Sequence, residues 1–185
     1  FVDDVESSGT AAEGRAPYGD SLDLNRFERP FSEDMTYIPD LDIYKFGLSW
    51  DADWYYVSIQ LIGNDPNNGL GINYGIELDR DADGYGDFIV WANPPYTPAW
   101  DTGSVQVFAD TNKDSGGSDV VRAETVFDGD GYETLIFDGG TGGNDDHDLA
   151  WVRLDDGQNI AIQFAIKKSW IGDSFMFGVV ADAGL

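Results

Sequence analysis

Short runs of alternating apolar and polar residues, separated by Asp- and Gly-rich turns, constrain the fold of this chain more than any other feature. The clearest run covers residues 54–61, in which Tyr55, Val57, Ile59 and Leu61 occupy alternate positions. Successive side chains of a β-strand point to opposite faces, so this pattern predicts a strand with one buried face. No segment of ten or more residues repeats its apolar positions with the 3.6-residue period of a helix.

About ten runs of this kind follow one another along the chain. They cover residues 43–50, 54–61, 72–78, 88–91, 105–108, 120–127, 132–137, 149–154, 160–166 and 175–181, with a further strand beginning near Leu22. Many short strands with turn residues between them are typical of sandwiches and jelly rolls. The sequence therefore predicts an all-β fold, a two-sheet antiparallel β-sandwich (jelly roll) of about ten strands.

Residues 1–20 are polar, and we interpret them as an N-terminal arm in front of a sandwich domain that covers residues 21–185. Such an arm rarely becomes ordered alone, so we expect it to pack on its own sheet or on another copy of the chain. In the second case it would donate a strand to the neighbouring sheet, as in β-augmentation. Phe1, Val2 and Val5 would then be the inserted residues.

The charge of the chain restricts its partners. Asp and Glu number 35 against 10 Lys and Arg, which gives a net charge of −25. Such a surface repels nucleic acid and anionic membranes and attracts divalent cations. No apolar run approaches 18 residues, so we expect no membrane span. The chain starts at Phe1, as an exported protein does after signal cleavage, and we expect it outside the cell or on its surface.

The stretch from residue 79 to residue 87 has the spacing of a calcium loop. Carboxylates stand at its first, third, fifth and ninth positions, and glycine stands at the sixth, where a calcium loop turns sharply. It departs from the usual pattern at the twelfth position, where Val90 replaces a glutamate. The alternative is a polar turn that holds no ion. The expected calcium ligands are Asp79, Asp81, Asp83, Tyr85 (through its carbonyl) and Asp87.

A weaker candidate for a second calcium site follows at residues 110–117. Asp110, Asn112 and Asp114 have the same spacing, but the glycines come one position late. The alternative is a turn stabilised by hydrogen bonds from Asx side chains. The acidic loop at residues 144–148 also has enough oxygens for a site, although a solvated loop is the simpler interpretation.

The sequence contains no recognisable catalytic centre. His147 is the only histidine and cysteine is absent, which excludes a zinc site with several His or Cys ligands. Neither a Gly-x-Ser-x-Gly motif nor a phosphate-binding loop is present. A glycosidase pair of carboxylates stays open in so acidic a chain, but the acids mostly occupy turns. We therefore expect a protein that is not an enzyme.

Three aromatic residues, Trp91, Tyr96 and Trp100, stand in or beside a proline-rich segment at residues 92–100. Exposed rings on a rigid loop can stack on sugars, so these residues are candidates for a ligand site. The alternative is that the rings pack against their own sandwich or against a neighbouring subunit.

The runs at residues 41–51 and 54–59 resemble the opening hairpin of DOMON-like sandwiches, which are close to the family 9 carbohydrate-binding modules. The stretch from Gly75 to Asp87 is similar to the calcium-bearing variants of secreted bacterial proteins. The resemblance, from about Leu22 to Ala183, implies a two-sheet jelly roll with metal in its loops and with sugar or haem as the ligand of some members. Haem members use Met and His ligands; because His147 lies in an acidic loop, we do not expect haem.

Two non-enzymatic functions follow as expectations. The first is a calcium-stabilised extracellular structural protein that assembles with copies of itself, as a filament or surface-layer subunit, through its N-terminal arm. The second is a carbohydrate-binding module whose aromatic residues bind a polysaccharide.

Overall fold

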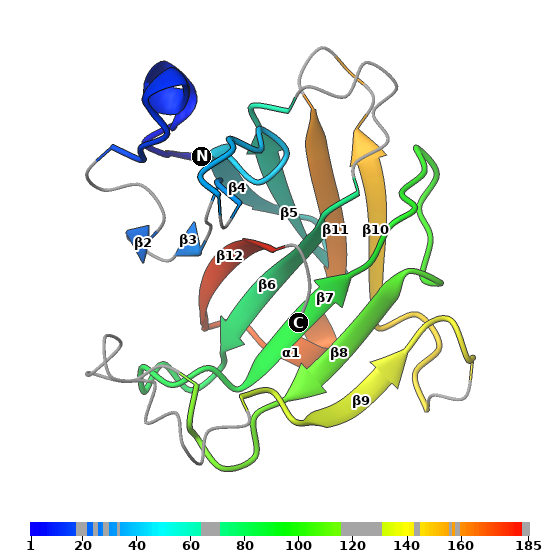
Figure 1. Cartoon of the computed structure of the whole chain (residues 1–185). Helices are drawn as coiled ribbons and strands as arrows, with labels where there is room; N and C mark the ends of the chain where they lie inside the picture. Colours follow the sequence, from blue (N-terminus) through cyan, green and yellow to red (C-terminus); the bar gives the residue numbers. More distant parts are fainter. Residues whose placement is uncertain are drawn as a thin grey trace.

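The computed structural model describes residues 1–17, 22–23, 26–27, 30–32, 34–63, 71–115, 131–142, 145–155, 157 and 160–182. These residues form two β-sheets that face one another as layers (Figure 1). The strands are β1 (Val2–Asp3), β2 (Leu22–Asp23), β3 (Arg26–Phe27), β4 (Ile43–Trp50), β5 (Trp54–Leu61), β6 (Asn73–Asp79), β7 (Phe88–Ala92), β8 (Val105–Ala109), β9 (Thr134–Asp138), β10 (Ala150–Asp155), β11 (Ala161–Lys167) and β12 (Met176–Asp182). A 3-10 helix, η1 (Ser8–Glu13), and one helical turn, α1 (Lys168–Ile171), complete the described elements.

One sheet has five strands in the order β1-β4-β5-β11-β10, and the other has seven in the order β2-β3-β12-β6-β7-β8-β9. Two hairpins, β4–β5 and β10–β11, supply most of the five-stranded sheet. The meander β6–β9 and the returning strand β12 supply most of the seven-stranded sheet. Neighbouring strands are antiparallel except for β12 and β3. The prediction of a two-sheet β-sandwich is confirmed; the run expected at residues 120–127 lies outside the described residues.

The core lies between the sheets and follows the alternation of the strands. In β5, Val57 and Ile59 are 2% and 0% exposed, while the residues on either side of each are only half-buried. Ile76 and Leu78 of β6 meet them from the other sheet as members of the same buried cluster. Burying each such aliphatic side chain contributes roughly 1.5–3 kcal/mol, so the facing sets hold the layers together.

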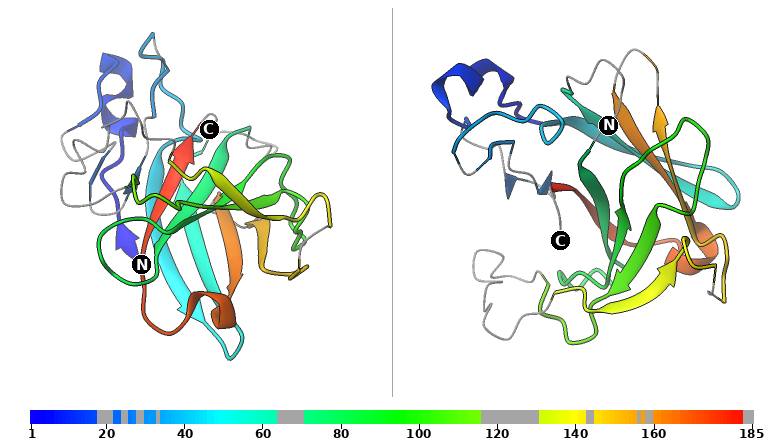
Figure 2. Two further views of the ribbon diagram at one scale, coloured as in Figure 1. Left: turned by 90° about the horizontal axis from the view of Figure 1, so that it is seen from below. Right: turned by 45° about the vertical axis from the view of Figure 1, so that its right-hand side comes forward.

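The N-terminal arm packs on its own domain. β1 pairs antiparallel with β4 at the edge of the five-stranded sheet, with Val2 opposite Phe46 (Figure 2). After β1 the chain turns into η1, and Ser7 between them is fully buried. Residues 2–4 of the arm therefore lie against the β4 of the same chain, which is the first of the two placements expected from the sequence. Among the described residues, no helix has the length and apolar character needed to cross a membrane.

Candidate functional site

The loop between β6 and β7 is a tight turn built on carboxylates. The N–H of Asp87 donates to the carbonyl of Leu78 at 2.8 Å and closes the hairpin. Asp79 Oδ2 accepts the N–H of Gly84 at 2.8 Å, and Asp87 Oδ2 accepts the N–H of Arg80 at 2.7 Å. Gly84 has a φ of 93°, a conformation that a residue with a Cβ rarely adopts. The sixth-position glycine thus does what the loop spacing requires.

Three of the predicted ligands come together in this loop. Asp79, Asp81 and Asp87 each place a carboxylate oxygen within 4.8 Å of the other two, and the group could hold a metal ion. Asp79, at the end of β6, is 7% exposed, so one of the three carboxylates is held in a largely desolvated position. A divalent cation would offset the repulsion between the three charges. Among the described residues, this is the group of acidic side chains with that geometry.

The other two predicted ligands of this loop have different partners. The carboxylate of Asp83 contacts the ammonium of Lys113, and this contact holds the pKa of Asp83 below its ordinary value. Lys113 Nζ also lies 3.5 Å from Asp81 Oδ2. Tyr85 donates its N–H to Asp83 Oδ1 at 3.0 Å. Lys113, which belongs to the second candidate loop, therefore places its ammonium beside two acids of the first loop.

The second candidate loop follows β8 and repeats the turn of the first. Asp110, 8% exposed, accepts the N–H of Asn112 at 3.0 Å and the N–H of Ser115 at 2.7 Å. Asp114 donates its N–H to Asn112 Oδ1 at 3.2 Å. The fourth residue is left-handed in both loops, with φ of 58° at Ala82 and 61° at Lys113. These hydrogen bonds are those expected for the alternative interpretation of residues 110–117, a turn stabilised by Asx side chains.

The two loops are docked against each other by their backbones. The N–H of Asp110 donates to the carbonyl of Asp87 at 2.9 Å, and the N–H of Gly86 donates to the carbonyl of Ser115 at 2.7 Å. The hydroxyl of Tyr132 would lie 2.1 Å from a Cβ at residue 86, so only glycine permits this packing. An ion held by the first loop would therefore also stabilise the second.

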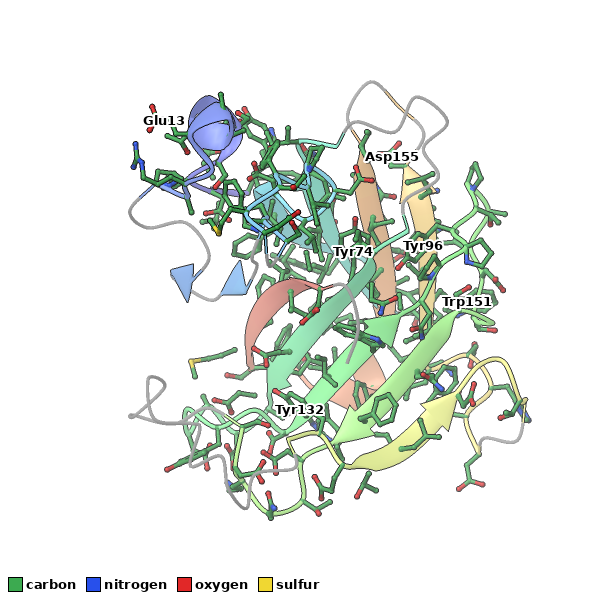
Figure 3. All side chains as sticks on the ribbon, viewed as in Figure 1. Glu13, Tyr74, Tyr96, Tyr132, Trp151 and Asp155 are labelled. Carbon is green, nitrogen blue, oxygen red and sulfur yellow. The ribbon has the colours of Figure 1, made fainter. Side chains whose placement is uncertain are left out.

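A buried acid lies beside the loops on β6. Tyr132, labelled in Figure 3, donates its hydroxyl to Glu77 Oε1 at 3.1 Å. Burial raises the pKa of Glu77, and burial together with the nearby carboxylate raises that of Tyr132. Glu77 is therefore destabilised as a carboxylate.

A groove of about 600 Å³ lies on the outer face of the five-stranded sheet, away from the acidic loops. Its floor comes from alternate residues of β5, β10 and β11, which point away from the core. Trp100 supplies one wall, because the N–H and carbonyl of Asp101 both bond Val152 of β10 at 2.9 Å. The polar and aromatic side chains that line it include Tyr56, Ser58, Gln60, Trp100, Arg153 and Gln163.

The side chains of the groove hold one another in place. Arg153 Nε donates to Gln163 Oε1 at 2.6 Å, and Gln163 Nε2 donates to Asp155 Oδ2 at 3.1 Å. The guanidinium of Arg153 lies 4.5 Å from the centre of the Trp100 ring. The centres of the Trp100 and Tyr56 rings lie 6.1 Å apart, and the ring planes are inclined at 45° to each other. The groove thus presents two fixed rings beside a row of polar groups.

Burial removes two of the three aromatic residues from the candidate ligand set. Trp91 is 2% exposed, so its indole offers no face to a ligand. Tyr96 packs against the core and donates its hydroxyl to the carbonyls of Ile72 and Ala92, at 2.8 and 2.9 Å. Burial also raises the pKa of Tyr96, which stays a neutral donor. Trp100 is the one of the three that lines the groove.

A lysine forms ion pairs with the acids of the loop before β10. Lys167 Nζ lies 2.6 Å from Asp146 Oδ1 and also contacts Asp148. These carboxylates raise the pKa of Lys167. The structure thus agrees with a solvated, ion-paired loop at the described residues 145–148.

Comparison of the chain with family models, with curated proteins and with solved structures finds no match. The resemblance to DOMON-like sandwiches and family 9 carbohydrate-binding modules therefore stays a prediction.

Tyr56, Arg153 and Gln163 were not among the site residues predicted from the sequence. A signal for them exists, because each stands at an outward position of a predicted strand, between two apolar residues that point inward. Three polar or aromatic residues at such positions predict a solvated face. Only the strand register brings them together, with Arg153 opposite Gln163 and Gln163 opposite Ser58.

Proposed function

We propose that the chain is a non-enzymatic, extracellular, calcium-stabilised module that binds a neutral polysaccharide in the groove of its five-stranded sheet. The observation that carries this proposal is the pairing of Trp100 and Tyr56, 6.1 Å apart, with the polar row of Arg153 and Gln163. The apolar face of a sugar ring packs on aromatic rings, and its hydroxyls need donors and acceptors at fixed positions.

An unsatisfied polar atom in the groove supports a hydroxyl-rich ligand. Gln60, which lines the groove, has a buried Oε1 without a hydrogen-bond partner among the described residues. A buried acceptor that lacks a donor costs free energy, about 1–3 kcal/mol. Rotation of the Gln60 side chain toward the groove would bring this oxygen within reach of a hydroxyl of a bound sugar.

The charge of the chain selects the kind of polysaccharide. A net charge of −25 repels polyanionic chains at long range, so a neutral polymer fits better than an acidic one. Asp155 is the one acidic side chain among the described residues that line the groove. Glycoside hydrolysis usually needs two carboxyl groups, so the groove supports binding without cleavage.

Calcium is our proposal for the ion at Asp79, Asp81 and Asp87. These ligands are hard carboxylate oxygens, and calcium accepts a wider range of oxygen geometries than the strict octahedron of magnesium. The candidate ion site shares no residue with the groove lining, which supports a structural role for the ion. It would stabilise the two docked loops and lower the repulsion of an acidic surface.

Affinity electrophoresis in native gels tests the binding proposal. Gels that contain β-glucan, xylan, glucomannan or mannan should retard the wild type in the presence of calcium. Trp100→Ala should migrate as in a gel without polysaccharide, whereas Trp50→Ala, whose ring is 65% exposed outside this groove, should still be retarded. Equal migration of the wild type in every gel would contradict the proposal.

Self-assembly through the arm is a second candidate, favoured by a separate observation. Phe1, Val2 and Val5 are 77%, 45% and 40% exposed, although β1 pairs with β4 over only two residues. A longer pairing with the β4 edge of a neighbouring copy, in place of the β1 of that copy, would bury more of these side chains. Electron micrographs with and without calcium test this candidate: ordered filaments or sheets would support it, and isolated particles in both conditions would count against it.

A further inference from the structure

Phe1 lies in the groove as well as in the arm. Its ring packs over Gly47 of β4, so that a Cβ at residue 47 would come within 2.7 Å of Phe1 Cδ1. Phe1 is among the residues that line the groove, on the β4 side, while Trp100 lines it beside β10. Lys45 Nζ lies 5.5 Å from the centre of the Phe1 ring. The ring is 77% exposed, which leaves most of it open to a ligand.

Several contacts with the rest of the domain hold the arm in this position. Besides the two-residue pairing of β1 with β4, the N–H of Asp4 donates to the carbonyl of Tyr44 at 2.9 Å. The N–H of Ser7 donates to Asp42 Oδ2 at 3.0 Å, and both residues are fully buried. The hydroxyl of Tyr37 bonds the same carboxylate oxygen. A ligand that contacts the docked arm can shift the population of the arm toward this position.

We propose that the N-terminal arm completes the ligand groove. Phe1 forms the wall opposite Trp100, and occupation of the groove and docking of the arm stabilise each other. This inference rests on the proposed polysaccharide function. A sugar chain that crosses the sheet contacts Phe1 only when the arm is docked, so it binds the docked form more tightly. By linkage, the factor by which docking of the arm tightens binding of the ligand equals the factor by which the ligand favours docking.

The Asp42 carboxylate is the fixed point of the arm. It lies outside the groove lining and bonds the arm at Ser7, so a substitution there tests the docking of the arm without changing a residue of the groove. Asp42→Asn keeps the shape of the side chain but replaces one of its two acceptor oxygens with a donor group. Phe1→Ala removes the ring itself and, at 77% exposure, leaves the folded core unchanged.

Affinity and hydrogen exchange of the full chain test the inference together. The probe is the neutral polysaccharide that retards the wild type. Phe1→Ala and Asp42→Asn should each weaken its binding by roughly three- to tenfold, the worth of one aromatic contact. Phe1→Tyr should bind as the wild type. In the wild type, the polysaccharide should slow amide exchange at residues 2–7.

Each outcome is decisive. If the wild type binds and Phe1→Ala binds equally well with unchanged exchange of the arm, the inference is wrong and the proposed function stands. If the wild type binds no neutral polysaccharide, the proposed function fails and the inference fails with it. Should Asp42→Asn lose its cooperative unfolding, Phe1→Ala decides alone.

Discussion

The outer faces of the two sheets differ, although both belong to one sandwich. On the seven-stranded sheet the outward residues Ile89 and Trp91 of β7 are 4% and 2% exposed, and the acidic loops lie at the ends of its strands. On the five-stranded sheet the outward residues Tyr56, Arg153 and Gln163 are half-buried and border a groove. The outer face of the seven-stranded sheet is therefore covered, and we call it the braced face. The outer face of the five-stranded sheet borders the groove, and we call it the open face. The difference teaches that the candidate ion site and the candidate ligand groove lie on different sheets of the fold.

Removal of calcium should have the largest effect, on the braced side. If the affinity is that of an extracellular module, saturating calcium contributes about 3 kcal/mol to the free energy of unfolding. A chelator should lower the melting temperature by roughly 5–10 °C. Asp81→Asn should reduce this difference, whereas Asp173→Asn, an exposed acid outside the loops, should keep it. Scanning calorimetry with calcium and with chelator measures the difference in melting temperature. An unchanged melting temperature would contradict a stabilising calcium ion at this loop.

Trp100→Ala should have the next largest effect, on the open side. Loss of this ring should cost about 2 kcal/mol of binding free energy, roughly a thirtyfold weaker affinity. Isothermal titration with the oligosaccharide of the retarding polymer measures the affinity. Calcium-dependent stability should not change, because Trp100 belongs to the groove. A loss of stability without a loss of affinity would mean that the ring is only a packing residue.

Glu77→Gln should have a smaller effect with a distinct pH dependence. Burial raises the pKa of Glu77 in the folded protein, so the folded state holds the proton more tightly than the unfolded chain. This preference stabilises the fold below the ordinary pKa of 4.5 and is lost as pH rises through the raised value. At neutral pH the amide variant should therefore be more stable than the wild type, by an amount on the order of 1 kcal/mol.

Glu133→Gln is the matched control for this pH experiment. A bond from the hydroxyl of Thr111 lowers the pKa of Glu133, so its carboxylate favours the folded state above the ordinary pKa. The two variants should differ in the sign of their change in stability at neutral pH. Urea unfolding at pH 4 and pH 7 measures both. The same sign for both variants would contradict the contrast between the buried acid and the loop acid.

Lys113→Met should have the smallest effect. Lys113 contacts Asp83 and lies 3.5 Å from Asp81, so it competes with an ion for the charge of the first loop. Its removal should tighten calcium binding by roughly two- to fivefold, as expected for exposed ion pairs. Lys45→Met makes the same change of net charge near the arm and should leave the calcium affinity within twofold. Calcium titration calorimetry compares them. Weaker calcium binding by Lys113→Met would show that the lysine orders the loop rather than competing with the ion.

The local features of the molecule could be predicted from the sequence. The alternation in β5 identified the buried face of that strand, because side-chain direction depends only on the strand period. The spacing from Asp79 to Asp87 identified a loop that could hold a metal ion, because its three clustered carboxylates lie within nine residues. The ion pair of Asp83 could not be predicted from this spacing, since its partner Lys113 belongs to another loop.

The non-local features could not be predicted in the same way. Trp91 has the sequence context of a ligand residue, but its exposure depends on what covers the outer face of β7. The groove joins Tyr56 to Arg153, and these residues meet only through the register of β5, β11 and β10. Sequence spacing contains no record of that register. The arm presents the same difficulty, because its sequence allows pairing within one chain or between two.

Amide hydrogen exchange with bound polysaccharide tests most directly whether the open face carries the ligand and the braced face carries the ion. Addition of the polymer in calcium should slow exchange in residues 48–58 and 150–155 and leave residues 79–91 unchanged. Removal of calcium should speed exchange in residues 79–87 and 110–115. Protection of residues 79–91 by the polysaccharide, with no change at residues 48–58, would contradict this account.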